Sequence, residues 1–256
     1  MPVRWDLTQC DGELADDEVH AWHCSLDLSE SVFAALHDLL DSDEKERAAR
    51  FKFSAPRQQF VVSHAFLRIL LARYLRKKSG ELRFRTSTHG KPELVEGNLR
   101  FNLSHTEGAA VLAVTRNRAV GVDVERIREN LEPLELADRF FSRQEAEWLR
   151  AQPESQRTSA FFACWTAKEA YIKACGGGLS IPLSEFNVIP QTGATELQLQ
   201  IHGKPEESER WSMWPLDWGP NFRSALAVEG RNLTVRLGRM PDLQTGNDAY
   251  SGAAGT

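Results

Sequence analysis

Long apolar runs and closely paired cysteines are both missing from this chain. No stretch approaches the roughly 20 apolar residues that cross a bilayer, and residues 1–10 hold no apolar core of a secretion signal. We therefore expect a cytoplasmic protein with no membrane partner. The four cysteines lack the paired spacing of a zinc site and are too few for a disulfide scaffold, so we expect free thiols.

An excess of basic charge is missing as well. The 256 residues carry a formal net charge of -5, which argues against a nucleic-acid partner bound through a broad basic surface. A local basic pocket for a small polyanion is compatible with this balance. With 41% hydrophobic and 26% charged residues, the composition is that of a globular protein with one large domain or two small ones.

Apolar residues at helical spacing predict two long helices. The first covers 57–75, and the second covers about 157–175, where Gly176 and the glycines after it end the helix. Shorter helices are predicted at three places: 32–40, from Asp41 with Glu44 as its capping partner, and from Ser142 with Glu145 as its capping partner.

Segments of alternating or continuous apolar character predict strands. They cover 19–28, 82–86, 99–105, 110–114, 120–125, 196–201, 210–214 and 225–228. Turn residues separate 110–114 from 120–125, and we expect these two strands to form a hairpin. In the second of them Asp123 and Glu125 project from one face. They are either the solvated outer face of an edge strand or a pair of ligands for a cation.

The chain resembles itself weakly across its midpoint. Helix 57–75 aligns without a gap with 157–175, and strand 111–114 aligns with 225–228. We therefore predict an α+β fold of two copies related by a pseudo-twofold axis, each a small antiparallel sheet packed on a long helix. The expected parts are an N-terminal half at 1–119, a C-terminal half with the acidic residues at 120–240, and a disordered tail at 241–256.

One helix carries charge where apolar residues surround it. Trp165, Glu169 and Lys173 stand four residues apart and fall on one helix face. In the aligned copy Ile69 stands opposite Glu169, so the acidic residue occurs in one half only. The alternative to a functional role is a solvated Glu–Lys pair worth roughly 0.2–0.5 kcal/mol.

Carboxylates and basic residues of the chain form a set suited to phosphate chemistry. Asp123, Glu125 and Glu169 are hard oxygen donors of the kind that Mg2+ prefers. The residues that would neutralise phosphate charge are Arg47, Arg57, Lys91, His105 and Lys173. Two copies that face each other would form a cleft, and ligand sites favour such interfaces. The second half would supply the carboxylates and the first half the basic residues, and this division suits a metal-bound pyrophosphate.

Two motifs carry a family resemblance. They are Gly121-Val122-Asp123-Val124-Glu125 and Trp165-Thr166-Ala167-Lys168-Glu169-Ala170-Tyr171-Ile172-Lys173. Together they resemble the two-part signature of the 4′-phosphopantetheinyl transferases. Further similar segments, in the family's order, are Gly90-Lys91-Pro92, Phe101-Asn102-Leu103-Ser104-His105, Arg139-Phe140-Phe141-Ser142 and 176–183. The length and the duplication resemble the monomeric Sfp type rather than the small trimeric holo-acyl-carrier-protein synthases.

The resemblance implies a transferase and its substrates. Such an enzyme moves the 4′-phosphopantetheine group of coenzyme A to a serine of an apo acyl or peptidyl carrier protein, as in secondary metabolite biosynthesis, and releases adenosine 3′,5′-bisphosphate. By position, Asp123, Glu125 and Glu169 would hold Mg2+ against the pyrophosphate. Glu169 or a metal-bound water would accept the serine proton, and Lys173 would stabilise charge on the phosphates.

The resemblance also implies the contacts to coenzyme A, the co-substrate. These are Arg47, Arg57, Lys91, Ser104, His105, Asp123 and Lys173, with Ser104 and His105 near the 3′-phosphate. Two other functions stay open at this point. One is a non-catalytic coenzyme A-binding module whose acidic residues are a solvated face, and the other is a metal-dependent pyrophosphate hydrolase.

Overall fold

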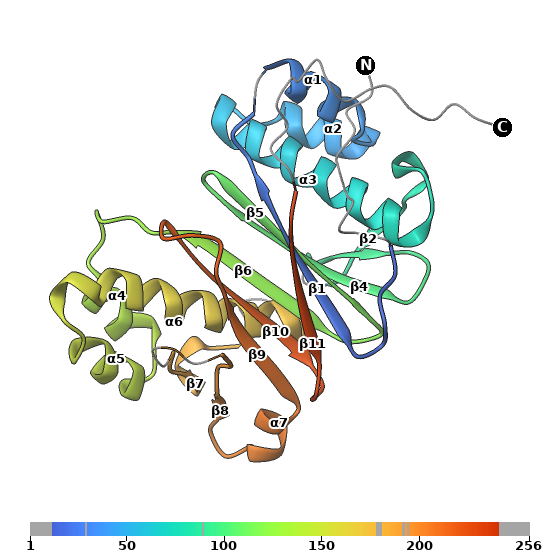
Figure 1. The fold of residues 1–256 in the computed structure, drawn as a ribbon. Helices are drawn as coiled ribbons and strands as arrows, with labels where there is room; N and C mark the ends of the chain where they lie inside the picture. The colour runs from blue at the N-terminus through green and yellow to red at the C-terminus, as the bar shows by residue number, and fades with distance from the viewer. Residues whose placement is uncertain are drawn as a thin grey trace.

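Two β-sheets lie between two groups of helices in the computed structural model, one group from each half of the chain (Figure 1). The structure describes residues 12–28, 30–88, 90–177, 181–190, 193 and 195–240. The tail predicted at 241–256 lies outside these residues, as do Cys10 and 178–180 of the glycine-rich motif. Within the described ranges no helix is long and apolar enough to cross a membrane.

The first half follows the predicted order of elements. It forms β1 (Glu18–Ser25), α1 (Glu30–Asp38), α2 (Ser42–Ala49), α3 (Ser54–Leu75), η1 (Ser79–Glu81), β2 (Phe84–Thr86), β3 (Pro92–Leu94), β4 (Leu99–Thr106) and β5 (Ala109–Arg116). The predicted capping pair is confirmed, because the Asp41 side chain accepts from the backbone N–H of Glu44 and the Glu44 carboxylate accepts from that of Asp41.

The second half repeats this order with insertions. It forms β6 (Val120–Arg126), α4 (Pro133–Phe140), α5 (Arg143–Arg150), α6 (Glu154–Cys175), η3 (Leu183–Glu185), β7 (Phe186–Val188), β8 (Leu199–Ile201), α7 (Pro205–Glu209), β9 (Trp211–Leu216), β10 (Phe222–Glu229) and β11 (Thr234–Arg239). Ser142 caps α5 as predicted. Gly176 ends α6 with a left-handed φ of 69°, which glycine adopts without strain.

The two main sheets have the strand orders β11-β1-β5-β4 and β6-β10-β9. Two short pairs, β2–β3 and β7–β8, lie beside them. Pairing is antiparallel throughout these ladders except that β11 runs parallel to β1. The sequence did not predict β11, which brings the end of the second half back into the sheet of the first.

The predicted hairpin of 110–114 with 120–125 is wrong, although both strands exist. β5 pairs with β1 and β4, whereas β6 pairs with β10 in the other sheet. Asn117, with a left-handed φ of 53°, ends the first sheet. The valines of β6 then face the first sheet and are buried between the two sheets. Burial of this apolar face against another sheet outweighs pairing of the strand with its sequence neighbour.

Apolar residues fill three layers and one smaller cluster. The first layer joins α1 and α3 to the four-stranded sheet. The second lies between the sheets, with residues of β1 and β5 on one side and of β6 and β10 on the other. The third joins α6 to the three-stranded sheet, and a separate cluster packs α4 and α5 on the first part of α6. The two halves therefore share an interface with an apolar centre.

The duplication is confirmed in the long helices. Both α3 and α6 have 22 residues, and each ends at a left-handed residue, Arg76 and Gly176 respectively. Each helix also carries one cationic side chain with no exposed surface, Arg68 in α3 and Lys168 in α6. These two residues are equivalent in the alignment of the halves, so the repeat extends to the buried charges.

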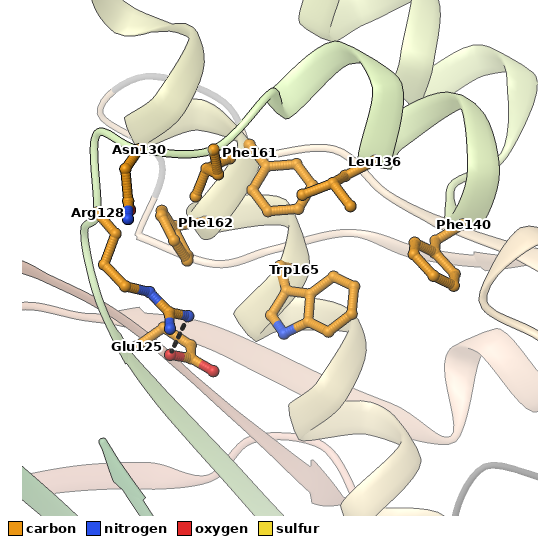
Figure 2. A pocket seen from close by; sticks show the side chains of 9 residues that line it. Glu125, Arg128, Asn130, Leu136, Phe140, Phe161, Phe162 and Trp165 are labelled. Carbon is orange, nitrogen blue, oxygen red and sulfur yellow. Dashed lines mark hydrogen bonds and ion pairs between the residues drawn. The ribbon is translucent and has the colours of Figure 1, made fainter. Parts of the chain in front are cut away.

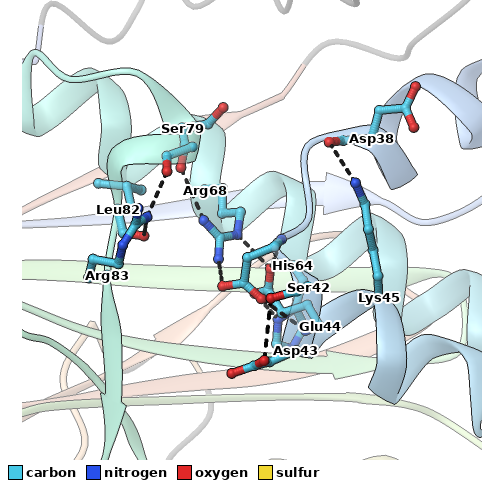
Figure 3. A network of polar contacts seen from close by, with 12 residues as sticks. Asp38, Ser42, Asp43, Glu44, Lys45, His64, Arg68, Ser79, Leu82 and Arg83 are labelled. Atoms are coloured by element: carbon cyan, nitrogen blue, oxygen red, sulfur yellow. Dashed lines mark hydrogen bonds and ion pairs between the residues drawn. The ribbon is translucent and has the colours of Figure 1, made fainter.

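Each buried cation is bound by the acidic residue of a capping box. Arg68 donates to Glu44 at 2.6 Å and to the carbonyl oxygen of Ser79 at 3.0 Å (Figure 3). Lys168 donates to Glu145 at 2.7 Å and to the carbonyl oxygen of Phe186 at 2.6 Å. The first turn of a short helix is thereby attached to each long helix, and through Lys168 this fixes the helix that carries Glu169.

Candidate functional site

Gly121 allows α6 to lie directly on β6. A Cβ atom at this position would fall 2.1 Å from the carbonyl oxygen of Ala170 and 2.3 Å from the backbone nitrogen of Ala174. Any other residue would push the helix away from the strand. Because side chains alternate along a strand, Asp123 and Glu125 project from the same face as Gly121, toward α6. The helix face that carries the predicted charged stripe therefore meets the two predicted carboxylates.

Asp123, Lys173 and Ser104 form a hydrogen-bonded triangle where the two halves meet. Lys173 Nζ donates to Asp123 Oδ1 at 2.6 Å and to Ser104 Oγ at 3.1 Å. The Ser104 hydroxyl donates to the same Asp123 oxygen at 2.8 Å. Asp123 is only 4% exposed, and its Oδ2 atom has no hydrogen-bond partner among the described residues. A buried carboxylate oxygen without a hydrogen-bond partner is suited to bind a cation.

Glu125 and Glu169 lie within electrostatic range of Asp123 and of each other. Burial, followed by the charge of Asp123, raises the pKa of both carboxyl groups. Opposing contacts are weaker: Thr106 donates to Glu125 Oε2 at 3.3 Å, and Arg128 lies 3.4 Å from the same oxygen. The three carboxylates therefore repel one another, and a cation among them would relieve that repulsion.

The donor set fits Mg2+ in its chemistry. Three carboxylates supply hard oxygen ligands, and Asp123 Oδ2 is free to act as one of them. In the part of the chain that the structure describes, no three His, Cys, Asp or Glu side chains converge to enclose a metal ion. The three acidic residues are therefore neighbours rather than a formed coordination shell, and ligation of Mg2+ by all three stays a prediction.

β4 presents the predicted pair Ser104 and His105 to opposite sides. Ser104 is buried against β6, whereas His105 is exposed. Although the residue as a whole is exposed, nearby protein atoms displace part of the water around its ring, and this lowers the pKa of His105. The charges of His64, Lys173 and Arg47 lower this pKa further, but solvent screens them at an exposed site. His105 and Arg47 thus form a basic group on the side of α2 and α3, where His64 pairs with Glu44 at 2.8 Å.

Lys91 is directed into the protein. Its Nζ atom donates to the carbonyl oxygens of Val120 at 2.8 Å and of Lys173 at 2.7 Å. Burial lowers the pKa of Lys91 to about 8. In this position the residue joins the first half to the start of β6 and to the last turn of α6. Contact of Lys91 with coenzyme A stays a prediction.

The two predicted arginines of the first half lie on exposed surface. The Arg47 guanidinium is 5.1 Å from the ring centre of Phe60, and that of Arg57 is 6.0 Å from the ring centre of Phe33. Arg47 is close enough to His105 to affect its pKa. For both arginines a role in binding coenzyme A stays a prediction.

An apolar pocket of about 360 Å³ opens beside Glu125 (Figure 2). Its other lining residues come from α4, α6 and the segment between β6 and α4: Arg128, Asn130, Leu131, Leu136, Phe140, Phe161, Phe162 and Trp165. Arg128 lies at the same side of the pocket as Glu125, with its guanidinium 5.7 Å from the ring centre of Phe162. Trp165, to which the sequence assigns no catalytic role, stacks on Phe161 and lines this pocket.

The sequence predictions missed three polar residues around the carboxylates. Asn102 and Thr106 of β4 bind the backbone of β6, and Arg128 pairs with Glu125. The signal for Asn102 was present, because it alternates with Ser104 along the strand predicted at 99–105, and Thr106 continues this alternation one residue beyond the predicted end. No comparable pattern marks Arg128.

Both halves of the chain match models of one family. The model of the 4′-phosphopantetheinyl transferase superfamily matches residues 119–227, and the model described as 4′-phosphopantetheinyl transferase, N-terminal, matches residues 21–117. The chain is 38% identical over 222 residues to 4′-phosphopantetheinyl transferase HetI of Nostoc sp. strain PCC 7120, and the aligned part covers 85% of this chain and 90% of that relative. It is 31% identical over 179 residues to 4′-phosphopantetheinyl transferase gsp of Aneurinibacillus migulanus, with 70% of this chain and 74% of that relative covered. It is 28% identical over 180 residues to 4′-phosphopantetheinyl transferase Sfp of Bacillus subtilis strain 168, with 70% of this chain and 79% of that relative covered.

Proposed function

The chain belongs to the 4′-phosphopantetheinyl transferase superfamily, and on that premise we propose that it transfers the 4′-phosphopantetheine group of coenzyme A to a serine of an apo acyl or peptidyl carrier protein. Mg2+ is the proposed cofactor, and adenosine 3′,5′-bisphosphate is the second product. The observation that carries the proposal is the placement of Asp123, Glu125, Glu169 and Lys173 side by side on β6 and α6, at the border of the two halves.

Coenzyme A fits this site in one direction. Its pyrophosphate belongs beside the three carboxylates and the Lys173 ammonium, because metal-binding oxygens and a cation lie together at the border of the two halves. The adenosine end, with its 3′-phosphate, then lies toward the basic group of His105 and Arg47. The uncharged pantetheine arm extends the other way, past Glu125 into the apolar pocket.

Glu169 is the proposed base for the carrier serine. Burial is the first cause that raises the pKa of Glu169, and a carboxylate of raised pKa is a better proton acceptor than an ordinary one. As the serine oxygen attacks the phosphorus that bears pantetheine, its proton passes to Glu169. The bond from that phosphorus to the bridging oxygen breaks, and adenosine 3′,5′-bisphosphate leaves with the electron pair.

Lys173 and Asp123 prepare the site for the charge of the pyrophosphate. The Lys173 ammonium is held by Asp123 and Ser104, so it is oriented before the substrate binds. When bound, Mg2+ would withdraw charge from the phosphate oxygens and favour departure of the leaving group. Asp123 Oδ2 and the carboxylates of Glu125 and Glu169 are the atoms of this chain that would hold the ion.

A single chain contains both sides of the site. Ser104 and His105 come from the first half, and the acidic residues come from the second. No second copy is needed to complete this arrangement, so we propose that the enzyme acts as a monomer in the cytoplasm, with coenzyme A and a carrier protein as its partners and without nucleic acid.

The proposal is tested by incubating the purified chain with coenzyme A, Mg2+ and a panel of apo carrier proteins. Intact-protein mass spectrometry should show each accepted carrier gaining one phosphopantetheine group. A carrier whose acceptor serine is replaced by alanine should gain nothing. Glu169→Gln should abolish the gain, whereas Glu147→Gln, at an exposed position of α5, should not.

Two results would count against the proposal in different ways. Absence of a mass gain on every class of carrier would remove the transferase function. A gain that persists unchanged with a chelator in place of Mg2+ would leave the transferase but remove the metal. Calorimetry with coenzyme A adds a further distinction, because a simple binding module would need neither Mg2+ nor the carboxylates.

A further inference from the structure

Among the described residues β6 has a strand partner on one side only, whereas β1, the equivalent strand of the first half, has a strand partner on each side. In the first sheet β1 has strand partners on both sides, β5 and β11. In the second sheet β6 stands at the edge and pairs with β10 alone, within the described residues. An edge strand leaves every second backbone N–H without a ladder partner. The outward N–H groups of the strand that carries Asp123 and Glu125 therefore need partners from outside its own sheet.

The side chains of three alternate residues of β4 supply hydrogen-bond partners for these N–H groups. Each places an oxygen atom on a backbone N–H of β6, in the pairs Asn102 with Val122 at 2.8 Å, Ser104 with Val124 at 3.3 Å and Thr106 with Arg126 at 3.3 Å. The two strands belong to different sheets. The contact is thus a row of side chains that takes the place of a backbone ladder.

Two of these side chains also hold the carboxylates of β6. The Ser104 hydroxyl donates to Asp123 at 2.8 Å, and the Thr106 hydroxyl donates to Glu125 at 3.3 Å. A hydroxyl has one hydrogen to donate and two lone pairs to accept with, so both contacts are possible at once. Each hydroxyl therefore binds one carboxylate and the backbone N–H of the next residue. The same pattern occurs twice, two residues apart.

We propose that Asn102 and Thr106 are positioning residues that fix the register of β6 against β4 and thereby direct Asp123 and Glu125 at α6. Side chains alternate along a strand, so a slip of one residue would turn both carboxylates away from the helix. The row of contacts disfavours such a slip, because it pairs three N–H groups and two carboxylates only in the observed register. The catalytic part of this inference rests on the proposed function, whereas the structural part does not.

Thr106→Val tests the inference, since it removes the hydroxyl and keeps the shape of the side chain. Thr106→Ser restores the hydroxyl, and Thr234→Val changes an exposed strand threonine as a matched control. With wild-type carrier, we expect Thr106→Val to lower kcat about tenfold and to change KM for coenzyme A by less than about twofold, because Glu125 is misaligned while the coenzyme A contacts remain. Thr106→Ser should recover kcat, and Thr234→Val should not lower it.

Amide hydrogen exchange measures the same contacts without any reaction. Asn102→Ala should speed exchange at Val122, and Thr106→Val should speed it at Arg126. Exchange at Asp123 should stay slow in both variants, because its N–H points toward β10. If these amides exchange as in the wild type, the row of contacts does not hold β6 and the inference is overturned.

The two readouts separate this inference from the proposed function. If the wild-type protein modifies no carrier, the proposed function fails, while exchange at Val122 and Arg126 still decides whether β4 fixes β6. If the wild type is active and Thr106→Val keeps its full kcat, the positioning role of Thr106 is refuted. A loss of kcat that Thr106→Ser does not recover would also refute it, because the hydroxyl would then not be the cause.

Discussion

Replacing Gly121 with alanine should separate the two elements that carry the acidic residues. The new methyl group would meet the backbone of α6 at Ala170 and Ala174, at distances between 2.1 and 2.9 Å. Backbone atoms cannot rotate away as a flexible side chain would. The conflict is therefore relieved only when α6 retreats from β6.

The size of this retreat follows from the distances. Ordinary contacts of a Cβ atom begin near 3.4 Å, so the helix must move by roughly 1 Å, at a cost of about 1–3 kcal/mol for overpacking. The same movement stretches the 2.6 Å contact between Lys173 and Asp123 toward the limit of a hydrogen bond. A misplacement of about 1 Å at a reacting centre costs about 10²-fold in rate.

The assay combines carrier modification with thermal unfolding. Gly121→Ala should lower kcat/KM for carrier modification by about 10²-fold while the protein still unfolds cooperatively, several degrees earlier than the wild type. Gly80→Ala is the matched control, since a Cβ atom there meets nothing within 4 Å. If Gly121→Ala keeps activity within about threefold of the wild type, the rate is insensitive to the spacing of β6 and α6 and the reasoning fails.

Three further predictions concern single contacts of α6. Burial and nearby charge raise the pKa of Glu169 above its value in the unfolded chain. Glu169 therefore stabilises the folded protein most at low pH, and this stabilisation is lost as the pH rises through the pKa that Glu169 has in the folded state. Glu169→Gln should thus be inactive, yet in buffer without Mg2+ it should unfold at a higher temperature than the wild type at pH 8, with a smaller difference at pH 4; a lower unfolding temperature at pH 8 in that buffer would contradict this. Lys168→Met leaves the buried Glu145 carboxylate without its cation and should cost about 3–5 kcal/mol by denaturant unfolding, whereas the double change with Glu145→Gln should recover part of the loss. Trp165→Leu alters the apolar pocket and should raise KM for coenzyme A by about tenfold with a smaller effect on kcat; an unchanged KM would place the pantetheine arm elsewhere.

Features set by local periodicity could be predicted from the sequence. The apolar spacing of α6 and its glycine end mark the helix, and strand alternation places Asp123 and Glu125 on one face. The internal repeat then relates α6 to α3. The neighbouring positions of Asp123 and Glu169 were predicted from the chemistry of the carboxylates and from the family resemblance of the two motifs, not from these local signals.

Features set by contacts between distant segments could not be predicted. The turn at Asn117 has a clear local signal, but only burial between the sheets decides that β6 leaves the sheet of β5. β11 was missed because its partner β1 lies at the other end of the chain and its burial pattern is irregular. A lysine such as Lys91 is ordinarily exposed, and only the fold brings two carbonyl oxygens to its Nζ atom.

The most direct test of the central claim is to count both products of one reaction. Wild-type protein with coenzyme A, Mg2+ and an apo carrier should yield modified carrier and adenosine 3′,5′-bisphosphate in equal amounts, and Asp123→Ala should yield neither. Release of adenosine 3′,5′-bisphosphate without modification of the carrier would indicate a hydrolase. Full activity of Asp123→Ala would show that the carboxylates at the border of the two halves are not the site of transfer.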